Sequence, residues 1–185
     1  MTPRSAGTRS VARLWEQARA GDFRGAGAAA RAALAALRAD QPPARRAELN
    51  LVLAFCSMRQ GRHSEALREL EAARDAAASL AADSGLALRI ATWNAELAYF
   101  QGRYSDANEL IDRLLPQLER RRDWAYAGFA LRIRIAILLA RADYDGAAAL
   151  ADRAVQVAEA SDDDYVLVQI LNILGAVHFD RLTER

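Results

Sequence analysis

Apolar residues recur at steps of three and four along almost the whole chain, a spacing that predicts amphipathic helices. Ala, Leu, Arg and Glu, which favour helix, fill most segments, and alternating strand patterns are nearly absent. Breaks fall at Gly, Pro and short polar stretches such as Gln41-Pro42-Pro43. We therefore expect an all-α chain with helices over about residues 9–20, 24–39, 44–60, 64–82, 85–101, 105–121, 123–141, 145–160 and 162–180.

One turn pattern occurs four times along the chain. Its copies are Gly21-Asp22-Phe23, Gly61-Arg62-His63, Gly102-Arg103-Tyr104 and Ala142-Asp143-Tyr144. In each copy a small residue follows the aromatic residue or His by three positions: Ala26, Ala66, Ala107 and Ala147. The turns follow one another at a nearly constant interval of about 40 residues, and a fixed period of this length predicts repeated helix pairs that stack on one another.

Several polar residues are placed to begin the helices. Ser64, Ser105 and Asp145 directly follow the turn aromatic or His, and we expect each to cap the helix that follows. Ser161 is expected to cap the last helix in the same way. Pro116 should end or kink its helix, because proline lacks the N–H that the helix requires.

Composition and charge exclude some classes of protein. The net charge is +1, with 25 basic residues that are all Arg and 24 acidic ones, so no bulk charge favours nucleic acid or an anionic membrane. Cys56 is the single cysteine, which excludes an internal disulfide and fits a reducing compartment. No apolar run is long enough to cross a bilayer, and the N-terminal segment lacks the apolar core of a signal peptide. We expect a cytoplasmic protein, and the preference for Arg and Ala suggests a bacterial source.

The residues around the turns resemble the tetratricopeptide repeat (TPR) family. That family places a large and a small apolar residue in its first helix, Gly at the turn, an aromatic two residues on, and Ala three further. The second unit fits with Leu53-Ala54, Gly61, His63 and Ala66, and the third with Ala95, Gly102, Tyr104 and Ala107. The family period is about 34 residues, whereas the spacing here is about 40 residues, which is typical of the longer repeats of bacterial regulators.

The resemblance implies a right-handed superhelical solenoid of antiparallel helix pairs with about four and a half repeats. We expect a flexible tail over residues 1–9 and a single solenoid domain over residues 10–185. The last unit looks incomplete, because its turn would begin near Leu182. Its helix, over residues 162–180, is rich in apolar residues that no later helix covers. We expect a chain truncated at its C-terminal end, and the alternative is a homodimer through residues 162–180.

The residue types that carry catalysis are too scattered to predict an enzyme. His63 replaces the turn aromatic and His178 lies in the last helix, so packing in a core or an interface explains both. Cys56 lies in an apolar segment and is interpreted as a small buried residue. Residues 162–164 and 120–122 are charged runs whose signs suit a helix start and a helix end. We expect no enzymatic activity, no cofactor and no metal site.

The resemblance places the binding surface on the concave groove that the first helices of the units line. Carried over position by position, this groove comprises Trp15, Arg19, Glu48, Leu51, Phe55, Met58, Arg59, Arg89, Thr92, Glu96, Tyr99, Phe100, Phe129, Arg132, Leu139, Gln169, Asn172 and Phe179. Large aromatics supply apolar area, and Arg supplies forked donors for carboxylates, which is the composition of binding hot spots. The alternative is that several of these residues pack between helices and never contact a ligand.

Three functions follow as expectations. The first is a scaffold that binds a protein or peptide in the groove, as the N-terminal sensing or interaction domain of a larger bacterial signalling or transcription regulator. The second is a free-standing adaptor that self-associates through its C-terminal helix. The third is a regulatory domain that senses a small molecule. Direct nucleic-acid binding is not expected, because the basic residues are matched by acidic ones and form no stripe.

Overall fold

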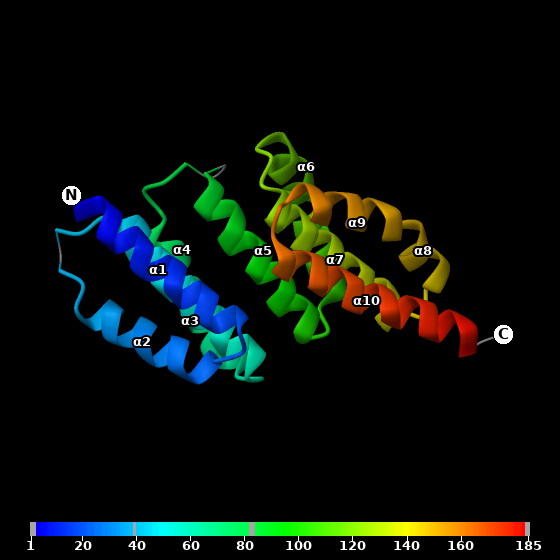
Figure 1. Ribbon diagram of the computed structural model, residues 1–185, viewed down its shortest axis with the longest axis horizontal. Helices are drawn as coiled ribbons and strands as arrows, with labels where there is room; N and C mark the ends of the chain where they lie inside the picture. Colours follow the sequence, from blue (N-terminus) through cyan, green and yellow to red (C-terminus); the bar gives the residue numbers. More distant parts are fainter. Residues whose placement is uncertain (1–2, 39, 82–83, 184–185) are drawn as a thin grey trace. The chain divides into compact units, whose positions relative to one another are not determined.

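The structure is a computed structural model that describes residues 3–38, 40–81 and 84–183. Within these ranges all regular elements are helices (Figure 1). They are α1 (Pro3–Arg19), α2 (Phe23–Ala35), α3 (Pro43–Arg59), α4 (His63–Ala76), α5 (Gly85–Phe100), α6 (Tyr104–Arg120), α7 (Trp124–Ala140), α8 (Tyr144–Ala149), α9 (Ala151–Ala160) and α10 (Asp164–Thr183). The prediction of an all-α chain is confirmed for the described residues.

Most helices lie close to their predicted positions, and the differences have local causes. Helix α1 begins at Pro3, so the tail expected over residues 1–9 is helical from Pro3 onward, and proline is well suited to the first helical position. The single helix expected over residues 145–160 is two helices, α8 and α9. At their junction the Leu150 N–H donates to the Ala147 carbonyl, three residues back, which tightens the turn. Helix α10 continues through Thr183, so the chain is still helical at Leu182, where a turn was expected.

The four turns found in the sequence share one backbone conformation. The residue that opens each turn has a positive φ: +94° at Gly21, +71° at Gly61, +72° at Gly102 and +57° at Ala142. Glycine adopts this left-handed region without steric cost, which explains its use in three of the four turns. The sequence period therefore corresponds to four equivalent chain reversals.

A second kind of turn repeats without a glycine signal. Arg122 and Asp162 have φ values of +56° and +51°. They occupy the same position in two successive units, between α6 and α7 and between α9 and α10. The predicted helix boundaries fall within one residue of both turns, but the left-handed conformation was not predicted because neither residue is a glycine.

Helix capping differs from the prediction by two positions. The carboxylate of Asp22 accepts from the Gly25 N–H at 2.8 Å, and that of Asp143 accepts from the Gly146 N–H at 2.9 Å. The helices thus begin at the turn aromatic, and the capping residue is the one before it. The residues expected to cap lie inside the first helical turn instead: Ser64, Ser105 and Asp145.

The last helix is capped by Asp163 rather than by Ser161. The Asp163 carboxylate accepts from the Tyr165 N–H at 3.0 Å. The Ser161 hydroxyl donates to the Ala158 carbonyl at 2.6 Å and so closes α9. Pro116 does not end its helix either, because α6 continues to Arg120 with this residue inside it and exposed.

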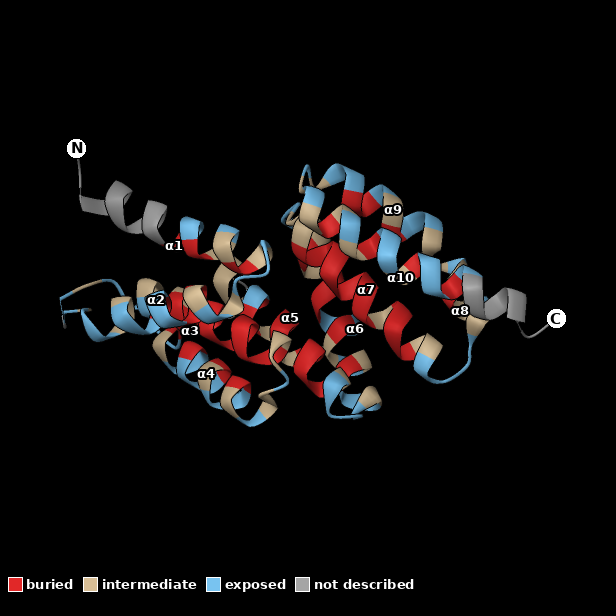
Figure 2. Ribbon diagram, turned by 60° about the horizontal axis from the view of Figure 1, so that its bottom comes forward, coloured by how far each residue is buried: buried red, intermediate tan, exposed pale blue. Residues whose placement is uncertain are grey.

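The chain divides into two compact halves, Met1–Leu97 and Ala98–Arg185. In the first half α3 packs against α1, α2 and α4, and in the second half α7 packs against α6, α8, α9 and α10. Both central helices are buried along most of their length, as the red ribbons of Figure 2 show. Each half thus has its core around one central helix, and a single continuous domain over residues 10–185 stays a prediction.

The small residue after each turn permits close helix contact. Ala26, Ala66, Ala107 and Ala147 are all fully buried. A larger side chain at these positions would separate the second helix of each pair from its neighbours, so the small residue is a packing requirement.

Candidate functional site

An aromatic cluster joins three helices of the first half of the chain. The Trp15 ring of α1 lies 5.3 Å from the Phe55 ring of α3 and stacks on the Trp93 ring of α5 at 6.2 Å, as measured between ring centroids. Phe55 and Trp93 are themselves 5.2 Å apart, edge to face. Phe55 and Trp93 are buried, whereas Trp15 is half-buried. Trp15 is therefore the member of the cluster that solvent or a partner can reach.

An arginine follows two of these aromatics by four positions. The guanidinium carbon of Arg19 lies 5.9 Å from the centroid of the Trp15 ring, and that of Arg59 lies 5.0 Å from the Phe55 ring. Residues four apart share a helix face, and a guanidinium at this distance interacts favourably with the ring. Both pairs stand at the same distance before the turn glycine of their unit, so the aromatic–arginine pair recurs in the first two of the four units.

A buried ion pair connects α3 with α5. Arg59 Nη2 lies 3.1 Å from Glu96 Oε1, and the Glu96 side chain is 0% exposed while that of Arg59 is 17% exposed. A carboxylate this deep requires a charged partner, since an unpaired buried charge is costly. Glu96, predicted as a groove residue, therefore serves to fix α5 against α3.

A second acidic group lies further along α3. Glu48 is half-buried, and burial raises the pKa of its carboxyl group, an effect that the nearby Arg89 and Arg45 oppose. Arg89 is exposed on α5. We call the surface formed by the accessible residues Trp15, Arg19, Glu48, Arg59 and Arg89 the α1–α3–α5 face.

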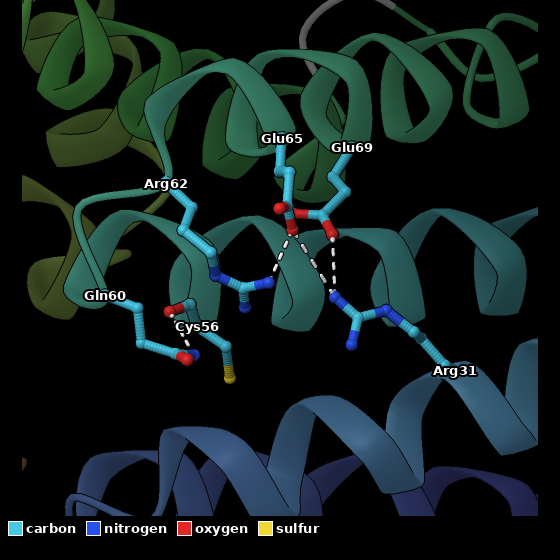
Figure 3. Close-up of polar contacts among 6 residues, drawn as sticks. All are labelled: Arg31, Cys56, Gln60, Arg62, Glu65 and Glu69. Atoms are coloured by element: carbon cyan, nitrogen blue, oxygen red, sulfur yellow. Dashed lines mark hydrogen bonds and ion pairs between the residues drawn. The ribbon is translucent and has the colours of Figure 1, made fainter.

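A polar cluster lies where α2 meets α4 (Figure 3). Arg62 Nη1 is 2.6 Å from Glu65 Oε2, and Arg31 Nη2 is 3.6 Å from the same oxygen. Arg31 Nη2 also lies 3.8 Å from Glu69 Oε1. Burial raises the pKa of Glu69, because loss of hydration disfavours its charged form. These ion pairs connect α2 with α4.

Cys56 lies on α3 beneath this cluster, with its thiol directed toward α2 (Figure 3). The Cys56 side chain is buried, as expected. It packs close to Gly27 of α2, where an added Cβ would lie 3.7 Å from the Cys56 Cβ. Burial raises the pKa of the thiol to about 11. Because the thiolate is the nucleophilic form, Cys56 is a packing residue rather than a reactive one.

The structure separates the predicted groove residues into three groups. Those that are buried, and so follow the packing alternative, are Leu51, Phe55, Met58, Thr92, Glu96, Phe129 and Arg132. Those that are half-buried are Trp15, Arg19, Glu48, Arg59, Tyr99, Leu139 and Gln169. The exposed ones are Arg89, Phe100 and Asn172, and Phe179 falls outside the described side chains. A role in partner binding stays a prediction for the accessible residues.

In the second half of the chain the predicted aromatics belong to separate ring contacts. Tyr99 lies 5.3 Å from Phe100 and 5.9 Å from Tyr104 between centroids. Phe129 instead packs against Tyr126 at 5.6 Å and Tyr165 at 6.2 Å. These contacts explain the burial of Phe129 at the junction of α7 and α10.

The sequence reasoning missed Trp93, which completes the aromatic cluster. Trp93 follows Arg89 by four positions and so lies one helical turn further along the predicted groove face. That spacing was the available signal, but the neighbouring Thr92 was assigned to the face instead. Thr92 is buried, and its hydroxyl donates to the Leu88 carbonyl at 2.9 Å.

Helix α10 presents apolar side chains to solvent. Val168 is 50% exposed and Leu171 is 51% exposed. Other residues of α10 are buried, among them Val166 and Ile170. His178 is exposed on the same helix, so a place for it in a core is wrong. His63 is half-buried.

Among the described residues, no group of three or more His, Cys, Asp or Glu side chains could hold a metal ion. None of the described helices combines the length and the apolar character that a membrane span requires.

No protein-family model matches this chain, and no curated protein matches it. Among solved structures, the chain is similar to the crystal structure of BtubC (BKLC) from P. vanneervenii, with a TM-score of 0.65. The sequences are 20% identical, and the match covers 96% of this chain and 82% of that one. At this identity the similarity concerns the fold alone.

Proposed function

We propose that this protein is a non-enzymatic TPR-like scaffold that binds a protein or peptide on its α1–α3–α5 face. In this proposal the four equivalent turns mark successive helix pairs of a right-handed solenoid. The observation that carries the proposal is the aromatic–arginine pair that recurs in two successive units, with Arg19 on Trp15 and Arg59 on Phe55.

The chemistry of the face points to a particular kind of partner. Trp15 offers a partly exposed ring, while Arg19 and Arg89 offer guanidinium groups within the same set of helices. Arg binds carboxylates through two parallel hydrogen bonds, and an aromatic ring binds an apolar side chain. We therefore expect an extended peptide or a helix in which an apolar side chain lies close to an acidic one.

The test begins with peptides selected from a random display library on the immobilised full chain. Binding of a selected peptide is then titrated against the Arg19→Ala/Arg89→Ala double variant. We expect a loss of about 1.5–3 kcal/mol in binding free energy for each charged hydrogen-bonded contact removed. The matched control is Arg68→Ala/Arg113→Ala, which removes two exposed arginines from α4 and α6. Equal losses in both double variants would reject the proposed face.

Self-association is a second candidate function, and the exposed Val168 and Leu171 of α10 favour it. Exposed apolar side chains that lie one helical turn apart form a patch that a second subunit could cover. Sedimentation should show a dimer for the chain and a monomer for the Val168→Glu/Leu171→Glu variant. A monomer at millimolar concentration for the unaltered chain would remove this candidate.

We further propose that binding on the α1–α3–α5 face controls a signalling or transcriptional output in a bacterial regulator. The support is the resemblance of its turns to long-period repeats of that kind. Expression of the chain with its natural flanking sequence, followed by an output assay with and without the selected peptide, tests this proposal. An output that does not respond to the peptide would contradict it.

A further inference from the structure

A cavity of about 320 Å³ lies in the first half of the chain, between the end of α4 and the first part of α5. Its lining residues are Arg74, Ala77, Ala78, Leu80, Ala87, Ile90, Ala91 and Asn94. This volume is at the lower end of the range found for small-molecule sites, about 300–1,000 Å³. The lining is mostly apolar, with one charged and one amide side chain.

The cavity exists because two positions that hold buried leucines in the next unit do not fill it. Counted from the turn glycine of each unit, Arg74 corresponds to Leu115 in the next unit. Ala77 corresponds in the same way to Leu118, and both leucines are buried. The α6–α7 contact is thus filled with leucine side chains at the positions where the space between α4 and α5 is left hollow.

Of the two polar lining residues, Arg74 departs from the pattern of the chain itself. The position of Arg74 is apolar in the other three units, where it holds Leu34, Leu115 and Val155. The position of Asn94 is polar in two of the other units, where it holds Arg13 and Arg134, and apolar in one, where it holds Leu53.

The unit after Asn94 has Arg134 at the same position, and Arg134 pairs with Asp112 on the neighbouring helix α6. In that unit the polar side chain therefore has an acidic partner from the protein. Between α4 and α5, the unusual Arg74 instead lines one cavity together with Asn94. This coincidence is what points to a ligand.

The polar residues lie at one end of the cavity. Helices α4 and α5 run in opposite directions on either side of their connection (Figure 1). Arg74 and Asn94 are the lining residues farthest from that connection, and Leu80 and Ala87 are the nearest to it. The cavity is therefore polar at one end and apolar at the other.

The two polar side chains are available as donors. The Asn94 amide donates to the Ile90 carbonyl at 3.0 Å, which orients it and leaves its second N–H for another acceptor. Arg74 Nε is 3.9 Å from Asp75 Oδ1, and the Arg74 side chain is 69% exposed. An exposed pair at this distance holds the guanidinium only weakly, so a ligand can recruit it.

We propose that this cavity binds a small aliphatic carboxylate. Its carboxylate accepts hydrogen bonds from Arg74 and from the Asn94 amide, and its alkyl chain lies among Ala77, Leu80 and Ile90. The site does not involve the α1–α3–α5 face, so it stands or falls independently of the peptide-binding proposal.

Calorimetric titration of the full chain with octanoate tests the ligand class, with octylamine and octan-1-ol as comparisons. We expect octanoate to bind about tenfold more tightly than octan-1-ol, because hydrogen bonds to a charged group are stronger than those between neutral groups. We expect no measurable binding of octylamine. Hexanoate should bind more weakly than octanoate by about fourfold for each methylene removed. Equal affinity for octanoate, octan-1-ol and octylamine, or no binding of octanoate, would overturn the proposal.

Variants that restore the residues of the next unit test the location. Ala77→Leu fills the cavity and should abolish octanoate binding, whereas Ala72→Leu on the exposed side of α4 should leave it unchanged. Arg74→Leu should weaken octanoate to the affinity of octan-1-ol, with Arg68→Leu as the matched control. Thermal melting verifies folding, and Ala91→Leu replaces Ala77→Leu if that variant does not fold. Octanoate binding that survives both Arg74→Leu and the cavity-filling variant would place the site elsewhere.

Discussion

Ala142 occupies the turn position that glycine holds in the other three units. Its φ of +57° is a left-handed conformation that costs a residue with a Cβ about 1–2 kcal/mol. Function at this turn does not require the strain, because the equivalent glycines adopt the same conformation freely. Among the four equivalent turns, Ala142 is therefore the one position at which glycine would be the less strained residue.

We predict that Ala142→Gly stabilises the protein. The relief of strain exceeds the entropy that glycine adds to the unfolded chain, for a net gain of about 0.5–1 kcal/mol in urea unfolding. Gly102→Ala should show the converse loss, since a Cβ there meets nothing within 4 Å and only the backbone is strained. A neutral result for both changes would show that the two turns are not strained as described.

Cys56 gives a second prediction at this scale. With its pKa raised to about 11, the buried thiol is almost entirely protonated at mildly alkaline pH, so a disulfide reagent such as DTNB should label it slowly. In concentrated guanidinium chloride the pKa returns to about 8.5 and labelling should be fast. Rapid labelling of the native protein would contradict the burial of this side chain.

Between elements, the Arg59–Glu96 pair should contribute far more than the exposed pairs. Arg59→Met removes the guanidinium that pairs with the fully buried Glu96 carboxylate, and we expect a loss of about 3 kcal/mol in the free energy of unfolding. Arg153→Met breaks an exposed pair with Glu119 between α9 and α6 and should cost less than about 1 kcal/mol. Urea titrations of the two variants make the comparison, and equal losses would count against a structural role for Glu96.

The contact between α7 and α10 depends on a residue without a side chain. A Cβ on Gly128 would lie 2.6 Å from Val166 Cγ1, closer than two carbons can approach. Val166 is β-branched and cannot easily rotate away. Gly128→Ala should therefore lower stability by about 1–3 kcal/mol despite the better helix propensity of alanine.

A second substitution isolates the cause of that loss. Val166→Ala removes the clashing methyl group, so the double variant should be less destabilised than the sum of the two single changes. Additive losses in the urea titrations would mean that α7 and α10 do not meet at these residues.

At the scale of the whole molecule, the local sequence pattern was sufficient to predict the positions of most helices and turns. The turn glycines at 21, 61 and 102 marked chain reversals because their type is tied to one backbone conformation. The breaks at Arg122 and Asp162 lie at predicted helix boundaries, but neither residue type marks the left-handed conformation as strongly as glycine does. Capping was misplaced for a related reason, since Asp143 and Asp145 are both good caps for α8 and only the backbone decides between them.

The candidate site was less predictable than the fold. Membership of a helix face follows from spacing, which brought Trp15, Phe55 and Arg59 into the predicted groove. Burial depends on what the neighbouring helices contribute, so spacing alone could not show that Phe55 lies inside and Trp15 at the edge. Trp93 was missed because a shift of one residue on a helix turns the side chain by about 100°.

The three tryptophan indoles offer the most direct test of the α1–α3–α5 face. In NMR spectra of the full chain titrated with a display-selected peptide, the indole N–H of Trp15 should shift, with amides of α1, α3 and α5. The Trp124 indole, at the start of α7, should not respond. Shifts confined to Trp124 and α10, with Trp15 unchanged, would contradict the proposed binding face.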